Sequence, residues 1–254
     1  MASWTELDEE LRRWAGSGRR ATLWWRDDDA GSATPALARL LALSRDHGAP
    51  LCLAVIPQQA DETLMEAIDG HACAVLQHGL AHENRAPEGE KKSEFGPHRP
   101  EYEMLADVAI GFEGLRGRFG GRHLPVFVPP WNRIAATLLP LLPLARIAAL
   151  STYRPRDSGE PAPGLRQVNC HADPIAWHDG RRFLGEEAAV GQIVEHLSRR
   201  RQGLCDADEP TGILTHHRIH DEGMWAFLEQ LFRQTGQSDS AHWLTGQQVF
   251  RLPE

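Results

Sequence analysis

The sequence contains few cysteines and no long hydrophobic run, and each shortage excludes a class of protein. Its four cysteines form no C-x-x-C pair, and Cys52, Cys73 and Cys170 stand in or beside apolar runs, so we expect buried free thiols. No apolar stretch approaches the roughly 18 residues that a membrane helix needs. The first residues are charged and lack the apolar segment of a signal peptide. These absences predict a soluble, cytoplasmic protein with no membrane partner.

The chain also lacks an excess of positive charge. It has 27 Lys and Arg residues against 35 Asp and Glu residues, which gives a net charge of -8. This balance argues against a broad surface for nucleic acid or for an anionic membrane, but it leaves room for a local basic pocket. The partner that we expect is therefore a small-molecule or glycan substrate.

The sequence does have about seven alternations of a strand-like segment with a helical one. Continuous apolar runs such as 50–57 are typical of strands buried on both faces, and segments such as 34–48 carry helix caps at both ends. This alternation predicts a parallel sheet with outer helices, and at this length a closed or nearly closed (β/α) barrel of about seven parallel strands. We expect one domain over 1–254, divided into a helix (1–19), the barrel (20–235) and an extension (236–254).

Polar side chains follow four of the predicted strands. Parallel α/β folds build their active sites at the carboxyl ends of strands, so we expect these segments to converge. In chain order they are Asp27–Asp29 in LWWRDDDAG, His78 and His82 in QHGLAHEN, Pro129–Trp131 in FVPPWN, and His216–His217 in GILTHH.

The spacing of His78 and His82 predicts a metal site. On a helical turn, residues four apart share a face and can hold one ion with two imidazoles. Chance also produces such pairs in a chain with 13 histidines, and His216 and His220 form a second one. The aspartates favour the first pair, because one carboxylate and two imidazoles bind a divalent ion and leave positions for water and substrate. A second aspartate could then deprotonate the water. The alternative for the aspartates is a solvated loop, which the two preceding tryptophans disfavour.

Two further segments could supply catalytic groups. The strand before His216 and His217 would carry both to the same rim, where one could act as a general acid and the other pack in the barrel. In FVPPWN, Pro129 and Pro130 fix the backbone, and Trp131 can wall a pocket or present its N–H to an oxyanion. A plain apolar turn is the alternative for this segment.

Together these residues resemble the polysaccharide deacetylase family, carbohydrate esterase family 4, over about residues 20–235. That family has a distorted (β/α) barrel, the NodB homology fold, and the motifs T-F-D-D, H-S/T-x-x-H, R-x-P-x-G and L-x-H. The segments RDDD, HGLAH, VPPWN and LTHH look like these motifs in the same order. The resemblance implies a metal-dependent hydrolase of carbon–nitrogen bonds, above all a deacetylase of N-acetylated sugars. The implied cofactor is Zn²⁺, with Co²⁺, Mn²⁺ or Ni²⁺ as alternatives.

The resemblance also implies roles for individual residues. Placing Arg26 in the Thr slot makes Asp28 the catalytic base and Asp29 a metal ligand, whereas a shift by one gives these roles to Asp27 and Asp28. We prefer the first alignment, in which the metal ligands are Asp29, His78 and His82. By the same comparison the catalytic histidine is His216 rather than His217. The residues expected to bind substrate are Arg26, Glu94, Pro130 and Trp131.

Three positions depart from the family's motifs. Val128 stands where an arginine pairs with the base, so Arg26 is the candidate to replace it, and Gly79 replaces the Ser or Thr between the two histidines. Ala176 replaces the second Asp of D-x-x-D-W, which tunes the catalytic histidine. Its substitute would be Asp173 or Asp221. These departures leave two other functions open: hydrolysis of small cyclic amides on the same fold, and a non-catalytic carbohydrate-binding or regulatory barrel.

Overall fold

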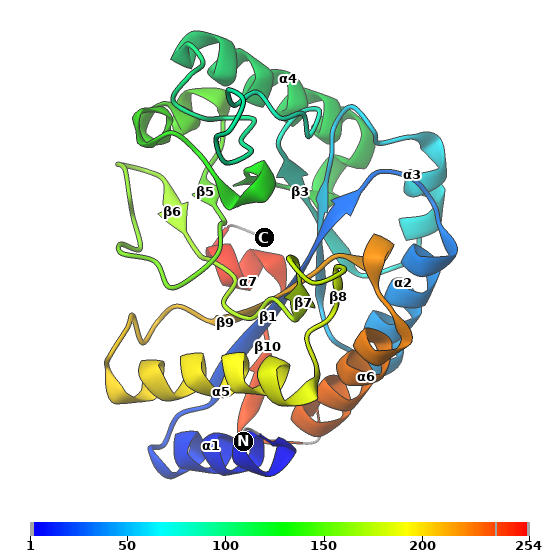
Figure 1. Cartoon of the computed structure of the whole chain (residues 1–254), viewed down its shortest axis with the longest axis vertical. Helices are drawn as coiled ribbons and strands as arrows, with labels where there is room; N and C mark the ends of the chain where they lie inside the picture. Colours follow the sequence, from blue (N-terminus) through cyan, green and yellow to red (C-terminus); the bar gives the residue numbers. More distant parts are fainter. Residues whose placement is uncertain (1–2, 237, 253–254) are drawn as a thin grey trace.

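A curled parallel sheet forms the centre of the protein (Figure 1). The computed structural model describes residues 3–236 and 238–252, and among them eight strands pair in the order β10-β1-β2-β3-β4-β5-β6, with β9 also on β1. The predicted distorted (β/α) barrel is confirmed. The strands are β1 (Ala21–Ala30), β2 (Leu51–Val55), β3 (Cys73–His78), β4 (His123–Val128), β5 (Ala149–Leu150), β6 (Arg166–Gln167), β9 (Thr211–Thr215) and β10 (Ala241–Trp243).

The barrel is incomplete between β6 and β9. In the described part of the chain no ladder joins these two strands, and the segment that follows β6 reaches β9 through a single parallel bridge between Ala172 and Ile213. A short antiparallel hairpin, β7 (Ile175–Ala176) and β8 (Arg182–Phe183), stands outside the main sheet. The barrel is distorted because its sheet is open between β6 and β9.

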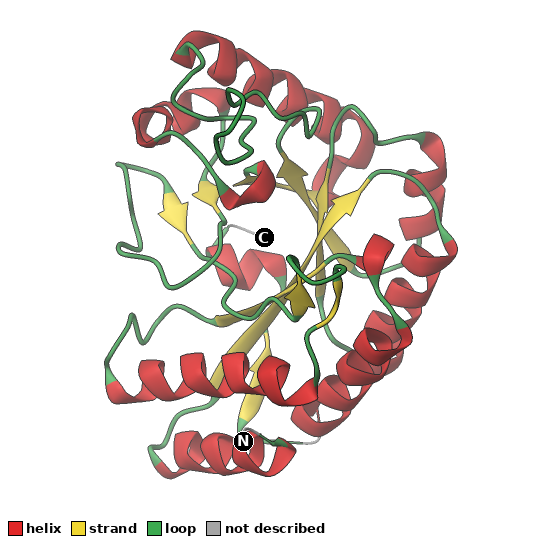
Figure 2. Ribbon diagram, viewed as in Figure 1, coloured by secondary structure: helices red, strands yellow, loops and turns green. Residues whose placement is uncertain are grey.

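The helices other than α7 lie on the outer side of the sheet (Figure 2). Their ends follow the sequence signals: α2 starts after Thr34, whose side chain accepts the N–H of Leu37, and stops at Gly48 with a φ of 60°. The segment 136–145 is a 3-10 helix rather than an α-helix and contains Pro140 and Pro143. The α-helices are α1 (Trp4–Gly16), α2 (Pro35–His47), α3 (Glu62–Ile68), α4 (Glu101–Phe119), α5 (Glu186–Gln202), α6 (Glu222–Gly236) and α7 (Gly246–Phe250). Within the described residues, none of these helices has the length and apolarity required to span a bilayer.

The core lies on both sides of the sheet. Neighbouring side chains of β1 point to opposite faces: Trp25 packs on Phe232 of α6 with ring centroids 4.7 Å apart, and Trp24 packs on Phe250 of α7 at 5.5 Å. The described part of the extension after 236 therefore joins the sheet and fills the barrel interior. Cys52, Cys73 and Cys170 are buried and free, as expected.

Candidate active site

The three aspartates at the end of β1 point in different directions. Because side chains alternate along a strand, Arg26 and Asp28 share one face of the sheet and Asp27 lies on the other. A register shift between Asp27 and Ala30 breaks the alternation, and Asp29 adopts a φ of 70°. The carboxylates are thus separated, and each meets its own partner. None of the three stands in a solvated loop, since Asp27 and Asp28 are buried and Asp29 is half-buried.

Asp27 is a structural residue that fastens β1 to the segment after β9. Its carboxylate accepts hydrogen bonds from the hydroxyl of Thr215 (2.6 Å), the backbone N–H of His217 (3.0 Å) and Nδ1 of the same histidine (2.5 Å). Burial opposes ionisation of Asp27, but these partners outweigh it and lower the pKa of the carboxyl. His217 is itself buried against this carboxylate, so the two residues satisfy each other in the core.

Asp28 forms a buried ion pair with Arg26. Nε of Arg26 donates to Oδ1 of Asp28 (2.8 Å) and Nη2 donates to Oδ2 (3.1 Å). The remaining donors of the guanidinium reach the Ser151 hydroxyl (2.7 Å), the Thr152 carbonyl (3.2 Å) and the Asn132 side-chain oxygen (2.8 Å). A buried pair satisfied in this way fixes the orientation of the carboxylate. Ser151 and Asn132 were not predicted as site residues from the sequence, although both follow strand ends.

Asp29, His78 and His82 come together at the rim of the barrel. Oδ1 of Asp29 lies 3.1 Å from Nε2 of His78 and 3.3 Å from Nε2 of His82. The three ligand atoms are within 4.8 Å of one another. Burial opposes ionisation of Asp29, but the hydrogen bond to His78 outweighs it and lowers the pKa of the carboxyl below its usual range. These are the residues that the sequence predicted as metal ligands.

The hydrogen bonds around His78 fit a cation at this place. Nδ1 of His78 lies 3.0 Å from the carbonyl oxygen of Val128, which can only accept, so Nδ1 carries a proton. In the neutral ring, Nε2 then presents a lone pair to the carboxylate of Asp29. Because the two atoms lie 3.1 Å apart, either a second ring proton, which makes His78 an imidazolium that donates to Asp29, or a metal ion must lie between them. The bond to a backbone carbonyl is also the usual means of orienting a metal-binding histidine.

The loop between the two histidines is not a helical turn, so that part of the prediction is wrong. His78 is the last residue of β3, Gly79 has a φ of 60°, and His82 has a φ of 59°. Glu94 holds the loop in this shape: its carboxylate accepts from the N–H groups of Ala81 (2.8 Å), His82 (3.2 Å) and Leu80 (3.4 Å). The chain reverses around a carboxylate instead of winding into a helix.

Two residues expected to contact substrate lie beneath the site instead. Arg26 is fully buried and Glu94 is 2% exposed, and their polar atoms are bonded to protein groups. Pro130 is also buried and packs against Gly79. Trp131, with a φ of 56°, presents its ring to His82 with centroids 4.5 Å apart. Of the four, Trp131 is the side chain that is only partly buried and lies beside a predicted metal ligand.

His216 lies on the same side of the barrel, directly after β9. It is 8% exposed, and its Nδ1 has no hydrogen-bond partner among the described residues. Its ring meets the edge of Trp177 at 4.7 Å, and the Trp177 indole N–H donates to Asp173 (2.7 Å). Asp221 instead accepts the backbone N–H groups of Phe183 in β8 (2.8 Å) and of Met224 near the start of α6 (2.9 Å). Asp173 is thus the carboxylate placed near His216. The backbone N–H of His216 donates to Nε2 of His220 (3.3 Å), which makes the second histidine pair a local structural contact.

A second cluster of possible ligands, His171, His196 and Glu209, does not fit a metal ion. Nδ1 of His171 accepts the N–H of Gly212 (3.0 Å), so the proton of the neutral ring is on Nε2, the atom that faces Glu209 at 3.2 Å. The rings of His171 and His196 are stacked 3.4 Å apart and nearly parallel, at 12°. Lone pairs in two parallel planes do not converge on one ion.

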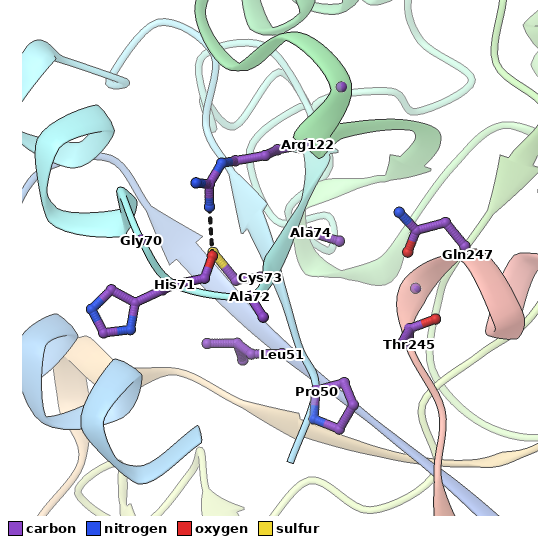
Figure 3. Close-up of a pocket in the computed structure, with 12 residues that line it drawn as sticks. Pro50, Leu51, Gly70, His71, Ala72, Cys73, Ala74, Arg122, Thr245 and Gln247 are labelled. Atoms are coloured by element: carbon purple, nitrogen blue, oxygen red, sulfur yellow. Dashed lines mark hydrogen bonds between the residues drawn. The ribbon is translucent and has the colours of Figure 1, made fainter. Parts of the chain in front are cut away.

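A cavity with a volume of about 480 Å³ lies where β2 and β3 begin, at the end of the sheet opposite the aspartates. Figure 3 shows the residues that line it. The guanidinium of Arg122 is engaged by the carbonyl oxygens of His71 (2.5 Å) and Ile68 (3.0 Å). No carboxylate is among its described lining residues. Its titratable lining residues are His71, Cys73 and Arg122, so it lacks the carboxylates that gather at the other end of the sheet.

Several solved structures share the architecture of this chain. A Mycobacterium smegmatis protein provisionally named a polysaccharide deacetylase superposes with a TM-score of 0.64 at 15% identity, covering 91% of this chain and 90% of that one. The peptidoglycan deacetylase PdaC from Bacillus subtilis matches with a TM-score of 0.58 at 12% identity, covering 91% of each chain. The chain has the polysaccharide deacetylase fold. A family 4 acetyl xylan esterase from Clostridium thermocellum, solved with a cobalt ion, matches with a TM-score of 0.55 at 14% identity and 91% coverage of each chain. No protein-family model matches the sequence, and no curated protein was found to be similar to it.

The polysaccharide deacetylase fold confirms, for the architecture, the resemblance that the motifs indicated. The structure also shows which groups lie at the positions that depart from those motifs. Val128 leaves the third motif without its arginine, and the guanidinium that reaches Asp28 comes from Arg26 on the first strand. A side chain on Gly79 would overlap Glu94, whose carboxylate bonds the loop N–H groups. Arg26 therefore takes the place of the arginine that Val128 replaces, and the missing side chain at Gly79 leaves room for Glu94.

Proposed function

We propose that the protein is a metal-dependent hydrolase that removes the acetyl group from an N-acetylated sugar or a related conjugate. The observation that carries the proposal is the juxtaposition on β1 of two carboxylates with different partners. Asp28 is held by a buried guanidinium, and Asp29 faces the imidazoles of His78 and His82. A carboxylate base next to a metal site is what amide hydrolysis by activated water requires. The names of the deacetylases and esterases that share the fold support the same chemistry.

The proposed cofactor is a divalent ion held by Asp29, His78 and His82. One carboxylate and two imidazoles suit Zn²⁺, and Co²⁺, Mn²⁺ or Ni²⁺ could substitute for it. When bound, the ion supplies a Lewis acid for the acetyl carbonyl and lowers the pKa of water.

In this proposal the chain's own side chains move the protons. Asp28 accepts a proton from the attacking water, and Arg26 holds its carboxylate while each oxygen keeps a free lone pair. His216, with its unpartnered Nδ1, donates a proton to the leaving amine. Trp131 walls the site beside His82, and its N–H stabilises the carbonyl oxygen as negative charge develops.

The test is acetate release by the full chain from N-acetylated sugars and their oligomers, with Zn²⁺ or Co²⁺ supplied. Because we expect a cytoplasmic protein, small metabolites and lipid-linked sugar precursors belong in the panel beside cell-wall polymers. The variant Asp28→Asn should keep its metal and lose activity by about 10²–10⁴-fold. Normal metal content together with full activity would refute the assignment of the base. No release from any acetylated compound, but turnover of small cyclic amides, would replace the proposed substrate class. No turnover at all in the metal-loaded protein would favour a non-catalytic barrel.

A further inference from the structure

Five arginines line one cavity near the end of the barrel opposite the aspartates. The cavity has a volume of about 310 Å³ and is formed by α1, the first residues of β1 and β6, α5 and α7. Among its described lining residues there is one carboxylate, Asp208. In a chain of net charge -8, this concentration of positive charge calls for a physical explanation. The five residues are Arg19, Arg20, Arg166, Arg200 and Arg251.

These charges have no direct carboxylate partners in the described residues. Within the described residues, none of the five arginines lies within 4.0 Å of a carboxylate oxygen. The partners that they do have are uncharged oxygens: Arg20 donates to the Ala241 carbonyl (2.9 Å), and Arg200 donates to the carbonyl (3.0 Å) and the hydroxyl (2.8 Å) of Thr22. The cavity wall therefore carries positive charge that no carboxylate pairs directly, and that Asp206, Asp208 and Glu209 offset only in part, from a longer distance.

Arg200 is the most deeply placed of the five. It is 2% exposed, and its Nε–H has no acceptor among the described residues. The guanidinium lies over the ring of Trp14 at 5.0 Å from the centroid, and Arg19 lies over the same ring at 4.6 Å. Burial and the charge of Arg19 lower the pKa of Arg200 to about 10, despite nearby groups that raise it. A buried donor without an acceptor costs free energy unless a ligand completes it.

Arg166, the first residue of β6, repeats this pattern. Its Nε–H is also buried without an acceptor in the described part of the chain. Burial comes first among the causes that lower its pKa, followed by the charges of Arg251 and Arg156. Mutual repulsion of this kind is relieved by an anion placed between the guanidinium groups.

We propose that this cavity binds a small organic phosphate. Planar guanidinium groups bind phosphate oxygens in pairs, and five of them line this one cavity. The cavity is larger than one phosphate group requires, and its wall includes apolar side chains from Trp14, Pro210, Leu244 and Val249, against which an organic part can lie. The site is separate from the candidate active site: Thr22 precedes Asp29 by seven residues of β1, which is roughly 20 Å of strand.

The experiment is a calorimetric titration of the full chain at constant ionic strength. The probes are inorganic phosphate, pyrophosphate and glucose 6-phosphate, with glucose as the neutral control. We expect saturable binding that is tighter for glucose 6-phosphate than for inorganic phosphate. The double variant R166Q/R251Q should bind at least about tenfold more weakly. The matched control is R12Q/R116Q, which removes the same charge from exposed arginines that do not line the cavity and should bind as the parent does.

Each result decides the proposal. Absence of saturable binding by all three phosphates would overturn it, and so would equal binding by R166Q/R251Q and the parent. If inorganic phosphate binds as tightly as glucose 6-phosphate, the claim that the ligand is an organic phosphate is wrong. Tryptophan fluorescence gives a second readout in the unaltered protein, since Trp14 stacks on two of the arginines and its emission should change on saturation. The outcome is independent of the proposed hydrolase, because these variants leave Asp28 and the metal ligands intact.

Discussion

Glu94 occupies the space that a side chain on Gly79 would need. A Cβ built on Gly79 would overlap Oε2 of Glu94 and lie 2.6 Å from Cγ of Pro130, and the φ of this glycine is 60°. The same carboxylate accepts three backbone N–H groups of the loop that ends at His82. Gly79 and Glu94 therefore act together: the glycine leaves room for the carboxylate, and the carboxylate fixes the loop that positions His82.

We predict that Gly79→Ser destabilises the protein by about 1–3 kcal/mol, because the added atoms must displace Glu94 or Pro130. Urea denaturation measures the change. Gly70→Ser is the matched control: this glycine has a φ of 76° but no atom within 4 Å of the added Cβ, so it reports the backbone strain alone. If the two variants lose the same stability, crowding around Glu94 contributes nothing.

Arg26→Lys should lower stability by roughly 1–3 kcal/mol and should also reduce the hydrolase activity proposed above, because lysine keeps the charge but loses the two-point contact with Asp28. Arg39→Lys is the control, since Arg39 makes a similar two-point contact with Glu222 on the surface, at 2.6 and 2.9 Å. We expect little change there, as solvent replaces what is lost. Equal effects of the two substitutions in thermal unfolding would contradict the importance of burial.

The architecture was predictable because its signals are local. Helix caps at Thr34 and Gly48 and buried apolar runs define the alternation, and parallel strands bring their ends to one rim, where Asp29 and His78 meet. Roles that depend on packing between distant segments were not predictable. The hydrogen bonds from the 80–82 loop to Glu94 produce no periodic pattern in the sequence. The spacing of four between His78 and His82 was therefore interpreted as a helical turn. The φ of 70° at Asp29 likewise follows from a local register shift that composition does not reveal.

Metal binding separates the two histidine clusters. We expect the purified full chain to bind about one equivalent of Zn²⁺ or Co²⁺, and His82→Gln to lose it, because a ligand is removed. His196→Gln should keep the metal, since the rings of His171 and His196 are stacked and do not converge on one ion. Elemental analysis after dialysis measures both variants. Loss of metal in His196→Gln but not in His82→Gln would reverse the assignment.

The adjacent histidines after β9 should respond differently to the same substitution. His216→Gln should reduce the proposed activity by about 10²–10⁴-fold with little change in the unfolding midpoint, since its Nδ1 makes no bond to described residues. His217→Gln should instead lower stability by about 3 kcal/mol, because it leaves Asp27 with an unpaired buried charge. Measuring kcat and urea unfolding for each variant gives four values. The assignment fails if His217→Gln is the variant that keeps its stability and loses kcat.

His123 predicts a loss of stability in mild acid. Burial, together with the charge of Arg116, lowers the pKa of His123 to about 4, and neither ring nitrogen has a partner in the described residues. The unfolded chain therefore binds a proton below pH 6.5 that the folded chain does not, and stability is lost as the pH falls from 6.5 toward 4. At pH 5 the loss is about 2 kcal/mol. His123→Phe removes this loss, so its stability relative to the parent should rise by that amount between pH 7.5 and pH 5. The exposed His242→Gln is the control, and a difference between His123→Phe and parent that stays constant with pH would show that His123 is not the group responsible.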